Sequence, residues 1–322
     1  YTLRASYIGY ASFRVENIRV SLDRTTNQNF VLKDHLTLGG LIARSFSPGI
    51  SGKQTARQIG ALWQDDLIAA GVNYLDIDPN FDPGIGFARR RDRMIGARFY
   101  LKPRPGGDII RQFEINPDFV YFHNDANVLQ SRRSRLLLAG VFQSGDRLQV
   151  NLQNDLERLT REFRIGPGVT LPVGTYQWNT ASLTFRSFNG RSFAGSAGVD
   201  IGNFYTGTKR SLNLDSNIRP NENIGFIPSY RFNAVALREG SFDTHLVGIR
   251  ANVSFTNNLL TSAFLQYNSS GDLAALQLRF NYIFRTIDNL HIVYNETRYT
   301  DGVFSGTSDR SLTTKLTYSL HR

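Results

Sequence analysis

The stretch LQLRFNYIF, residues 276–284, alternates with the two-residue period of a β-strand that has unlike faces. One face carries Leu276, Leu278, Phe280, Tyr282 and Phe284, and the other carries Gln277, Arg279, Asn281 and Ile283. In a soluble sandwich the apolar face would pack in a core and the polar face would meet bulk water. In a membrane barrel the apolar face would meet lipid and the polar face would line an interior.

The same alternation recurs along the chain. It is clear in DRMIGARFYLK (92–102), RQFEINPDFVY (111–121), RLQVNLQN (147–154), LVGIRANVSF (246–255) and SLTTKLTYSL (311–320). Turn-forming clusters such as QSGD (143–146) and SSGD (269–272) separate such stretches and suit hairpin connections. No linker or composition shift divides the chain. The pattern predicts one antiparallel domain over residues 1–322 with about 18 strands, within a range of 16–18. These strands are expected to begin near residues 1, 13, 35, 55, 67, 92, 108, 127, 146, 174, 191, 207, 222, 242, 259, 272, 288 and 311.

Strand length and composition favour the membrane alternative. Two of the alternating stretches contain 11 residues, close to the length that a tilted membrane strand needs. The longest apolar runs, such as LLLAGVF (136–142), are far too short for a membrane helix. The rival is a soluble sandwich or propeller, but no blade repeat of roughly 40 to 50 residues is present. We therefore predict an all-β fold: a transmembrane antiparallel up-and-down β-barrel in the bacterial outer membrane.

The connections predict a topology for this barrel. If the C-terminus is periplasmic, the long connections at residues 79–91, 161–175 and 298–310 all fall on the outer side, where such barrels carry their longer loops. RTTNQNFVLKD (24–34) is expected to be a long connection on the inner side and breaks this rule. The strand pattern is weakest in residues 1–34.

Phasing each strand by its apolar residues predicts which side chains line the lumen. The predicted lumen-lining residues are Arg98, Arg186, Arg231, Arg250, Arg279, Lys315, Glu114, Asp118, Asp200 and Asp215. The predicted lipid-facing residues are Leu276, Leu278, Phe280, Tyr282, Phe284, Leu312, Leu316, Tyr318 and Leu320. Arg or Lys facing lipid at mid-depth would cost about 2–4 kcal/mol, so gathering of these charges on one face supports the phasing. The charges either line a pore or fill the barrel as a salt-bridged network.

Other chemistry is weakly indicated. The net charge is +10, but Lys and Arg are scattered, so no nucleic-acid partner is expected. The five histidines lack metal-ligand spacing, and the chain contains no cysteine. We expect no metal, no cofactor, no catalytic residue and no enzymatic activity. The alternative of an outer-membrane hydrolase depends on a constellation at the rim, for which FHND (122–125) is the nearest candidate.

Several stretches resemble a known family. They are NFDPGIGFARRRDR (80–93), VDIGNFYTGTKRSLNLDSNIRPNENI (199–224), GSFDTHLVGIRANVSFTNNLLTSAFLQYNSSGDLAALQLRFNYIFR (240–285) and NLHIVYNETR (289–298). Together they resemble the C-terminal outer-membrane barrel of domain-of-unknown-function family 5916, from about residue 35 onward. Members usually carry a carbohydrate-binding-like module ahead of the barrel, which is absent from this sequence. The resemblance implies an outer-membrane barrel and brings no established activity.

These observations predict a passive outer-membrane pore with a net basic lumen, because barrels of this size usually enclose water. The alternative is a scaffold or partner-binding barrel in a larger assembly for secretion or electron transfer. The expected partners are outer-membrane lipid, the barrel-assembly machinery and a periplasmic or surface protein. The last strand resembles the terminal strand that the assembly machinery recognises, although the chain ends in His-Arg rather than an aromatic residue.

Overall fold

The structure is a computed structural model, and it describes residues 3–5, 13–15, 26–32, 35–47, 49–83, 92–285, 288–300 and 306–319. Every regular element in these residues is a β-strand, which confirms the all-β prediction. The connections between successive paired strands make the arrangement antiparallel and up-and-down. Among the described residues, no helix is long and apolar enough to cross a membrane.

The chain divides into two compact units. Unit 1 comprises Tyr1–Gly140, Asn151–Arg161 and Val173–Asn179, and unit 2 comprises Val141–Val150, Glu162–Pro172 and Thr180–Arg322. The division passes through three strands, β9 (Leu129–Phe142), β10 (Arg147–Leu159) and β13 (Gly174–Arg186).

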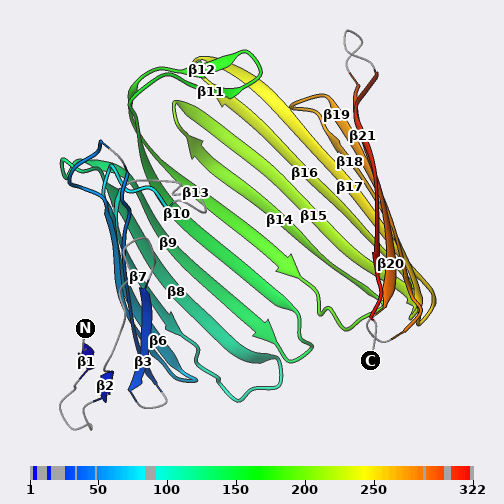
Figure 1. Cartoon of the computed structure of the whole chain (residues 1–322), viewed down its shortest axis with the longest axis horizontal. Coiled ribbons are helices and arrows are strands. Elements are labelled where there is room, and N and C mark those ends of the chain that lie inside the picture. The colour runs from blue at the N-terminus through cyan, green and yellow to red at the C-terminus, as the bar shows by residue number, and fades with distance from the viewer. Residues whose placement is uncertain are drawn as a thin grey trace. The chain divides into compact units, whose positions relative to one another are not determined.

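The sheet of unit 1 is a run of antiparallel hairpins (Figure 1). Its strands are β3 (Thr26–Leu32), β4 (Leu36–Arg44), β5 (Thr55–Gln64), β6 (Ile68–Ile77), β7 (Arg93–Leu101) and β8 (Ile110–His123), followed by most of β9. We call its "loop end" the end with the connections at 45–54, 78–92 and 124–128. The opposite "turn end" has the connections at 65–67 and 102–109.

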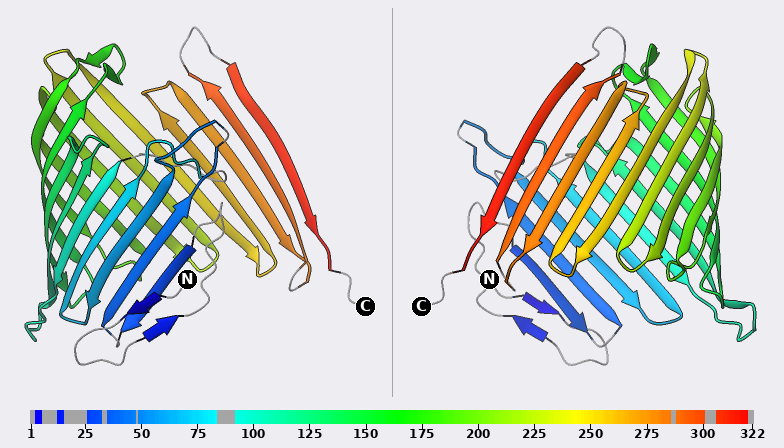
Figure 2. Two further views of the ribbon diagram at one scale, coloured as in Figure 1. Left: turned by 60° about the vertical axis from the view of Figure 1, so that its left-hand side comes forward. Right: turned by 90° about the vertical axis from the view of Figure 1, so that its right-hand side faces the viewer.

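The sheet of unit 2 has longer strands, which Figure 2 shows lying side by side in chain order. They are β14 (Phe193–Phe204), β15 (Gly207–Asn221), β16 (Ile224–Leu237), β17 (Gly240–Thr256), β18 (Leu259–Asn268), β19 (Leu273–Ile283), β20 (Asn289–Tyr299) and β21 (Gly306–Thr317). Its loop end has the connections at 160–173 and 300–305, and its turn end has those at 222–223, 257–258 and 284–288. The short β11 (Phe163–Gly166) and β12 (Val169–Leu171) form a hairpin of their own in the 160–173 connection.

The tight connections form where the sequence supplies turn residues. Gly145 and Asp272 adopt positive φ (84° and 46°) inside QSGD and SSGD, the two clusters expected to be hairpin turns. Side chains complete other turns: the Asn221 carboxamide oxygen accepts the amides of Asn223 and Ile224 at 3.0 and 2.9 Å. Such side-chain acceptors replace the ladder hydrogen bonds that end at the turn.

The first 34 residues differ from the prediction. The strands expected near residues 1 and 13 are β1 (Leu3–Ala5) and β2 (Phe13–Val15), and they form a separate two-stranded sheet. The expected connection at 24–34 instead contains β3, which pairs with β4 from Thr26↔Ile42 to Leu32↔Leu36. That prediction was wrong because β4 offers a row of unpaired backbone groups at its edge, and pairing them outweighs the polar composition of the segment.

Burial is unlike that of a soluble sandwich. Large apolar side chains are exposed on most strands, including Leu312 at 68%, Ile59 at 65% and Leu316 at 64%. Buried apolar residues among those described are few and mostly small, such as Ala43, Ala56 and Ala194. A soluble protein rarely leaves so much contiguous apolar surface in water. Each unit is thus a single-layered sheet with an apolar face that lacks a covering partner among the described residues.

Candidate functional site

Each sheet has one polar face, and this face is the candidate site. In unit 2 the strand registers put paired residues on the same face: Arg279 pairs with Ser262, Ser262 with Asn252, and Lys315 with His291. The same registers put Leu278 beside Ala263 and Tyr294, and Leu312 beside Tyr294, on the opposite face. We call these the polar face and the apolar face of unit 2.

Hydrogen bonds connect neighbouring strands across the polar face of unit 2. The Ser211 hydroxyl donates to Asn233 (2.8 Å), and the Asn233 amide donates to Thr244 (2.9 Å). In a second row, Gln277 donates to Asn295 (2.9 Å) and Asn295 donates to Ser311 (3.3 Å). These rows satisfy polar side chains without any apolar partner. The composition of this face therefore suits contact with water.

The charges on this face are unequal. Arg231 donates to Asp215 at 3.0 Å, and the Asn213 amide donates to Asp200 at 3.0 Å. Arg250 lies over the ring of Phe264, with its guanidinium carbon 4.5 Å from the ring centre. Three further cations form no ion pair with any residue that the structure describes: Arg186, Arg279 and Lys315. Unit 2 thus has a surplus of positive charge on its polar face.

Unit 1 has a more nearly balanced polar face. Arg98 and Asp118 are register partners, and Arg135 donates to Asp118 at 2.5 Å. Arg133 likewise donates to Asp155 at 3.1 Å, and the side chain of Asp155 is 11% exposed. Arg98 itself has no hydrogen-bond or ion-pair partner among the described residues. Its guanidinium is therefore available to an anion.

A groove lies in front of Arg98 on the polar face of unit 1. Its volume is about 550 Å³, and glycines of adjacent strands, including Gly60, Gly71 and Gly96, make its floor. A Cβ at Gly71 would lie 3.3 Å from Nε of Arg98, so the missing side chain makes room for the arginine to lie along the sheet. Gln58, Asn73 and Tyr100 add polar atoms to the walls.

Loops fold onto the polar face at the loop end of each unit. In unit 1, Phe81 packs against Ala43 and Ala56, with Leu41 and Ile77 beside them. In unit 2, the β11–β12 hairpin packs on β17, since a Cβ at Gly166 would lie 2.6 Å from the ring of Phe242. Phe242 pairs with Val235, and Val235 pairs with Lys209, which lies two residues before Ser211 on β15. Phe242 therefore lies on the same polar face as Ser211. Val169 and Leu171 of the hairpin are buried, at 3% and 0% exposure. These segments narrow the space above both polar faces.

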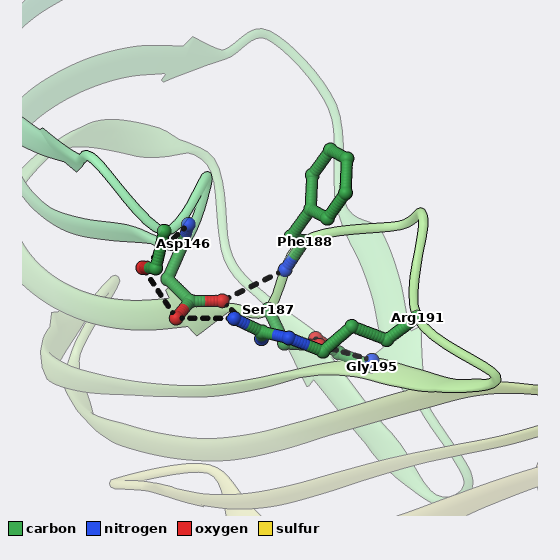
Figure 3. A network of polar contacts seen from close by, with 6 residues as sticks. Asp146, Ser187, Phe188, Arg191 and Gly195 are labelled. Atoms are coloured by element: carbon green, nitrogen blue, oxygen red, sulfur yellow. Dashed lines mark hydrogen bonds and ion pairs between the residues drawn. The ribbon is translucent and has the colours of Figure 1, made fainter. Parts of the chain in front are cut away.

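The turn end of unit 2 is held by a polar network (Figure 3). Arg191 donates two hydrogen bonds to the Asp146 carboxylate (2.5 and 3.0 Å), and the Phe188 amide donates a third (2.8 Å). The side-chain bonds from Arg191 and then Ser144, followed by the Phe188 amide, hold the pKa of Asp146 well below its usual range. Because every carboxylate oxygen is engaged, the network is structural: it ties the turn at 143–146 to the connection at 187–192.

The registers place the predicted lumen residues of unit 2 on its polar face, and Arg98 and Asp118 share the polar face of unit 1 with Glu114 by the strand period. Phe284 follows the end of β19 and lies 6.5 Å from Tyr318, ring to ring. Leu320 lies outside the described residues. Whether these faces meet lumen and lipid stays a prediction.

Sequence reasoning did not predict three features of the site. They are the hydrogen bond from Arg135 to Asp118, the packing of Phe81 on the polar face of unit 1, and the charged residues on the apolar face near Tyr294. The last had a signal, because Glu296 and Arg298 follow Leu290 with the same two-residue phase. Two residues of the rim candidate are engaged elsewhere, since Asp125 pairs with Lys53 and Asn124 accepts the Val128 amide. The Nδ1 atom of His123 is buried and has no hydrogen-bond partner among the described residues. Among the described residues, no group of three or more His, Asp or Glu is placed to hold a metal ion.

No family model matches the chain, and a search of curated proteins finds no relative. The resemblance to domain-of-unknown-function family 5916 therefore stays a prediction.

Proposed function

We propose that the chain closes into one β-barrel of the bacterial outer membrane and acts as a passive pore with a net basic lumen. The observation that carries this proposal is the separation of the two faces. On strand after strand, exposed Leu, Ile, Val and Phe lie on one side, while Arg, Lys, Asp, Asn and Ser lie on the other. Such an apolar face is stable in contact with lipid, and the polar face is stable in contact with water.

Aromatic residues support the same orientation. On the apolar face of unit 2, Tyr282, Phe284 and Tyr318 gather at the turn end, while Phe232, His245 and Tyr267 lie toward the loop end. Aromatic side chains at both edges of an apolar band are typical of membrane barrels, because their rings favour the level of the lipid headgroups. Residues of the apolar band, such as Ile249 and Leu278, lie between them.

Anions are the favoured solutes of the proposed pore. Arg186, Arg279 and Lys315 add positive potential in unit 2, and Arg98 adds a guanidinium beside the groove of unit 1. In a narrow lumen with low-dielectric walls, such unpaired charges raise the local concentration of anions.

The test is single-channel recording of the purified full chain in a planar bilayer. Stepwise conductance would support the pore, and a detergent-free, monodisperse soluble protein would refute the membrane location. A second candidate is a partner-binding scaffold with a closed lumen, favoured by the β11–β12 hairpin and Phe81 over the polar faces. Membrane insertion without conductance, together with a stoichiometric co-purifying protein, would favour the scaffold.

A further inference from the structure

A charged cluster lies on the apolar face of unit 2. Arg298 and Arg310 donate to the same oxygen of Glu296 at 2.5 and 3.1 Å, and the Tyr294 hydroxyl donates to its other oxygen at 2.6 Å. The registers put Glu296 beside Leu276, and Tyr294 beside Leu278 and Leu312. The four residues, which we call the Glu296 cluster, therefore share a face with the apolar band.

The Glu296 cluster turns its cations outward. The side chain of Glu296 is 9% exposed, whereas those of Arg298 and Arg310 are 60% and 55% exposed. The planar guanidinium of Arg298 bonds Glu296 through Nε, and its other two nitrogens suit the oxygens of a phosphate.

An apolar groove adjoins this cluster. Its volume is about 350 Å³, and its lining includes Ala251, Ala263, Leu278, Phe280, Ile292 and Tyr294, together with Val253, Thr261, Ser262 and Arg279. Ala251 pairs with Ala263, and Ala263 pairs with Leu278, so two small side chains lie side by side and hollow the sheet surface. Tyr294 belongs to both features: its ring borders the groove, and its hydroxyl bonds Glu296. The groove and the cluster are thus continuous.

We propose that the groove and the Glu296 cluster together bind lipid A, the phosphorylated and acylated glycolipid of the outer leaflet. An acyl chain fits the apolar groove, and a phosphate fits the outward edge of Arg298, whose side chain is 60% exposed. Charges on a lipid-exposed face are tolerated near the headgroups and not at mid-depth, and the cluster lies in the part of β20 and β21 nearest the loop end. This inference rests on the proposed outer-membrane location.

The test is titration of the full chain in detergent micelles with bisphosphorylated lipid A, read as the shift in thermal unfolding midpoint. The probes for comparison are dephosphorylated lipid A, phosphatidylglycerol and inorganic phosphate. We expect a saturable upward shift with lipid A that exceeds the shifts with the other three. Equal shifts with phosphatidylglycerol or with dephosphorylated lipid A would overturn the proposal, and so would an equal shift with inorganic phosphate.

Variants separate the two halves of the site. Arg298→Gln leaves Glu296 with Arg310 and Tyr294 as partners, so it should fold, and it should weaken lipid A binding by about tenfold or more. Ala263→Phe should weaken it comparably by filling the groove. Lys315→Gln removes a cation from the polar face of β21 and should leave lipid A binding unchanged. Unchanged affinity in both Arg298→Gln and Ala263→Phe would overturn the site.

Conductance of the same preparation distinguishes this inference from the proposed pore. Lipid A binding without conductance would support the lipid site and refute the pore. Conductance without lipid A binding would support the pore and overturn the lipid site.

Discussion

At the scale of the residue, one step along a strand changes the environment of a side chain. Leu278 pairs with Ala263 and Tyr294 on the apolar face, and Gln277 pairs with Phe264 and Asn295 on the polar face. If the apolar face meets lipid, Leu278→Arg should cost about 2–4 kcal/mol or more and block assembly, whereas Gln277→Arg should be tolerated. Assembly of both variants can be measured by heat-modifiable migration on gels, which is a property of folded membrane barrels.

These two variants are matched in charge, size and strand. Since Leu278 is already 43% exposed, a soluble sheet would accept arginine there as readily as at position 277. Folding of both variants to the same extent would therefore contradict the assignment of the apolar face to lipid.

A second residue-scale prediction concerns acid. The pKa of Asp146 is held low by Arg191, Ser144 and the Phe188 amide, so the unfolded chain takes up this proton first as the pH falls. The contacts of the Asp146 carboxylate therefore stabilise the folded state fully above the ordinary carboxyl pKa of about 3.9. This stabilisation is lost as the pH falls through the lowered pKa of Asp146. We expect amide hydrogen exchange at Phe188, followed by mass spectrometry and corrected for intrinsic rates, to accelerate at acid pH.

The control is Asp146→Asn, which removes the titrating group. Exchange at Phe188 should then be fast already at pH 7 and should lose this acid dependence. An unchanged acid dependence in Asp146→Asn would assign it to another group.

At the scale of the element, sequence periodicity predicts what is regular and misses what depends on a neighbour. The strands from β4 onward that pair into long hairpins begin close to the expected positions, because each carries its own two-residue alternation. β3 does not: Thr26, Asn27, Gln28 and Asn29 are all polar, and only pairing with β4 makes them a strand. The signal for these four residues lies in partners 10 to 16 residues away along the chain rather than within the segment.

The β11–β12 hairpin shows the same limit. Residues 161–175 contain three glycines and two prolines, a composition typical of a loop, and a loop is what the sequence predicts. Its fold over the polar face depends on the bare backbone of Gly166 meeting the Phe242 ring, a contact between distant segments. Likewise, strand phase could predict that Arg98 and Asp118 share a face, but it could not predict that Arg135 would take Asp118 and leave Arg98 unpaired.

This hairpin supplies a prediction. Replacing residues 162–172 with a short Gly-Asn-Gly turn should raise single-channel conductance without impairing assembly, because the hairpin packs on the polar face of β17 and the strands keep their own ladders. The control is the same three-residue change at the 257–258 turn, which lies at the opposite end of unit 2 and should leave conductance unchanged. A conductance that is unaffected by removal of the hairpin would show that it does not narrow the pore.

At the scale of the whole molecule, charge distribution decides what a pore would select. The acids neutralise part of the basic charge in pairs: Arg231 with Asp215 in unit 2, and Arg135 with Asp118 and Arg133 with Asp155 in unit 1. The remaining surplus on the polar face of unit 2 includes Arg186, Arg279 and Lys315. Arg250 contacts the Phe264 ring and forms no ion pair with a described residue. Filling by a fully paired network is thus disfavoured.

The unpaired surplus leads to a measurable selectivity. Arg250 and Arg279 lie on the same polar face, joined by the registers through Phe264 and Ser262. We expect the reversal potential under a salt gradient to show weak anion preference, which should fade at high salt because the Debye length falls from about 10 Å at 0.1 M to about 3 Å at 1 M. Arg250→Gln with Arg279→Gln should reduce that preference. Arg298→Gln, on the apolar face, removes one cation of the same kind and should leave the reversal potential where it is. Cation preference in the parent chain, or equal reversal potentials in the parent and the double variant, would contradict a lumen lined by the polar face.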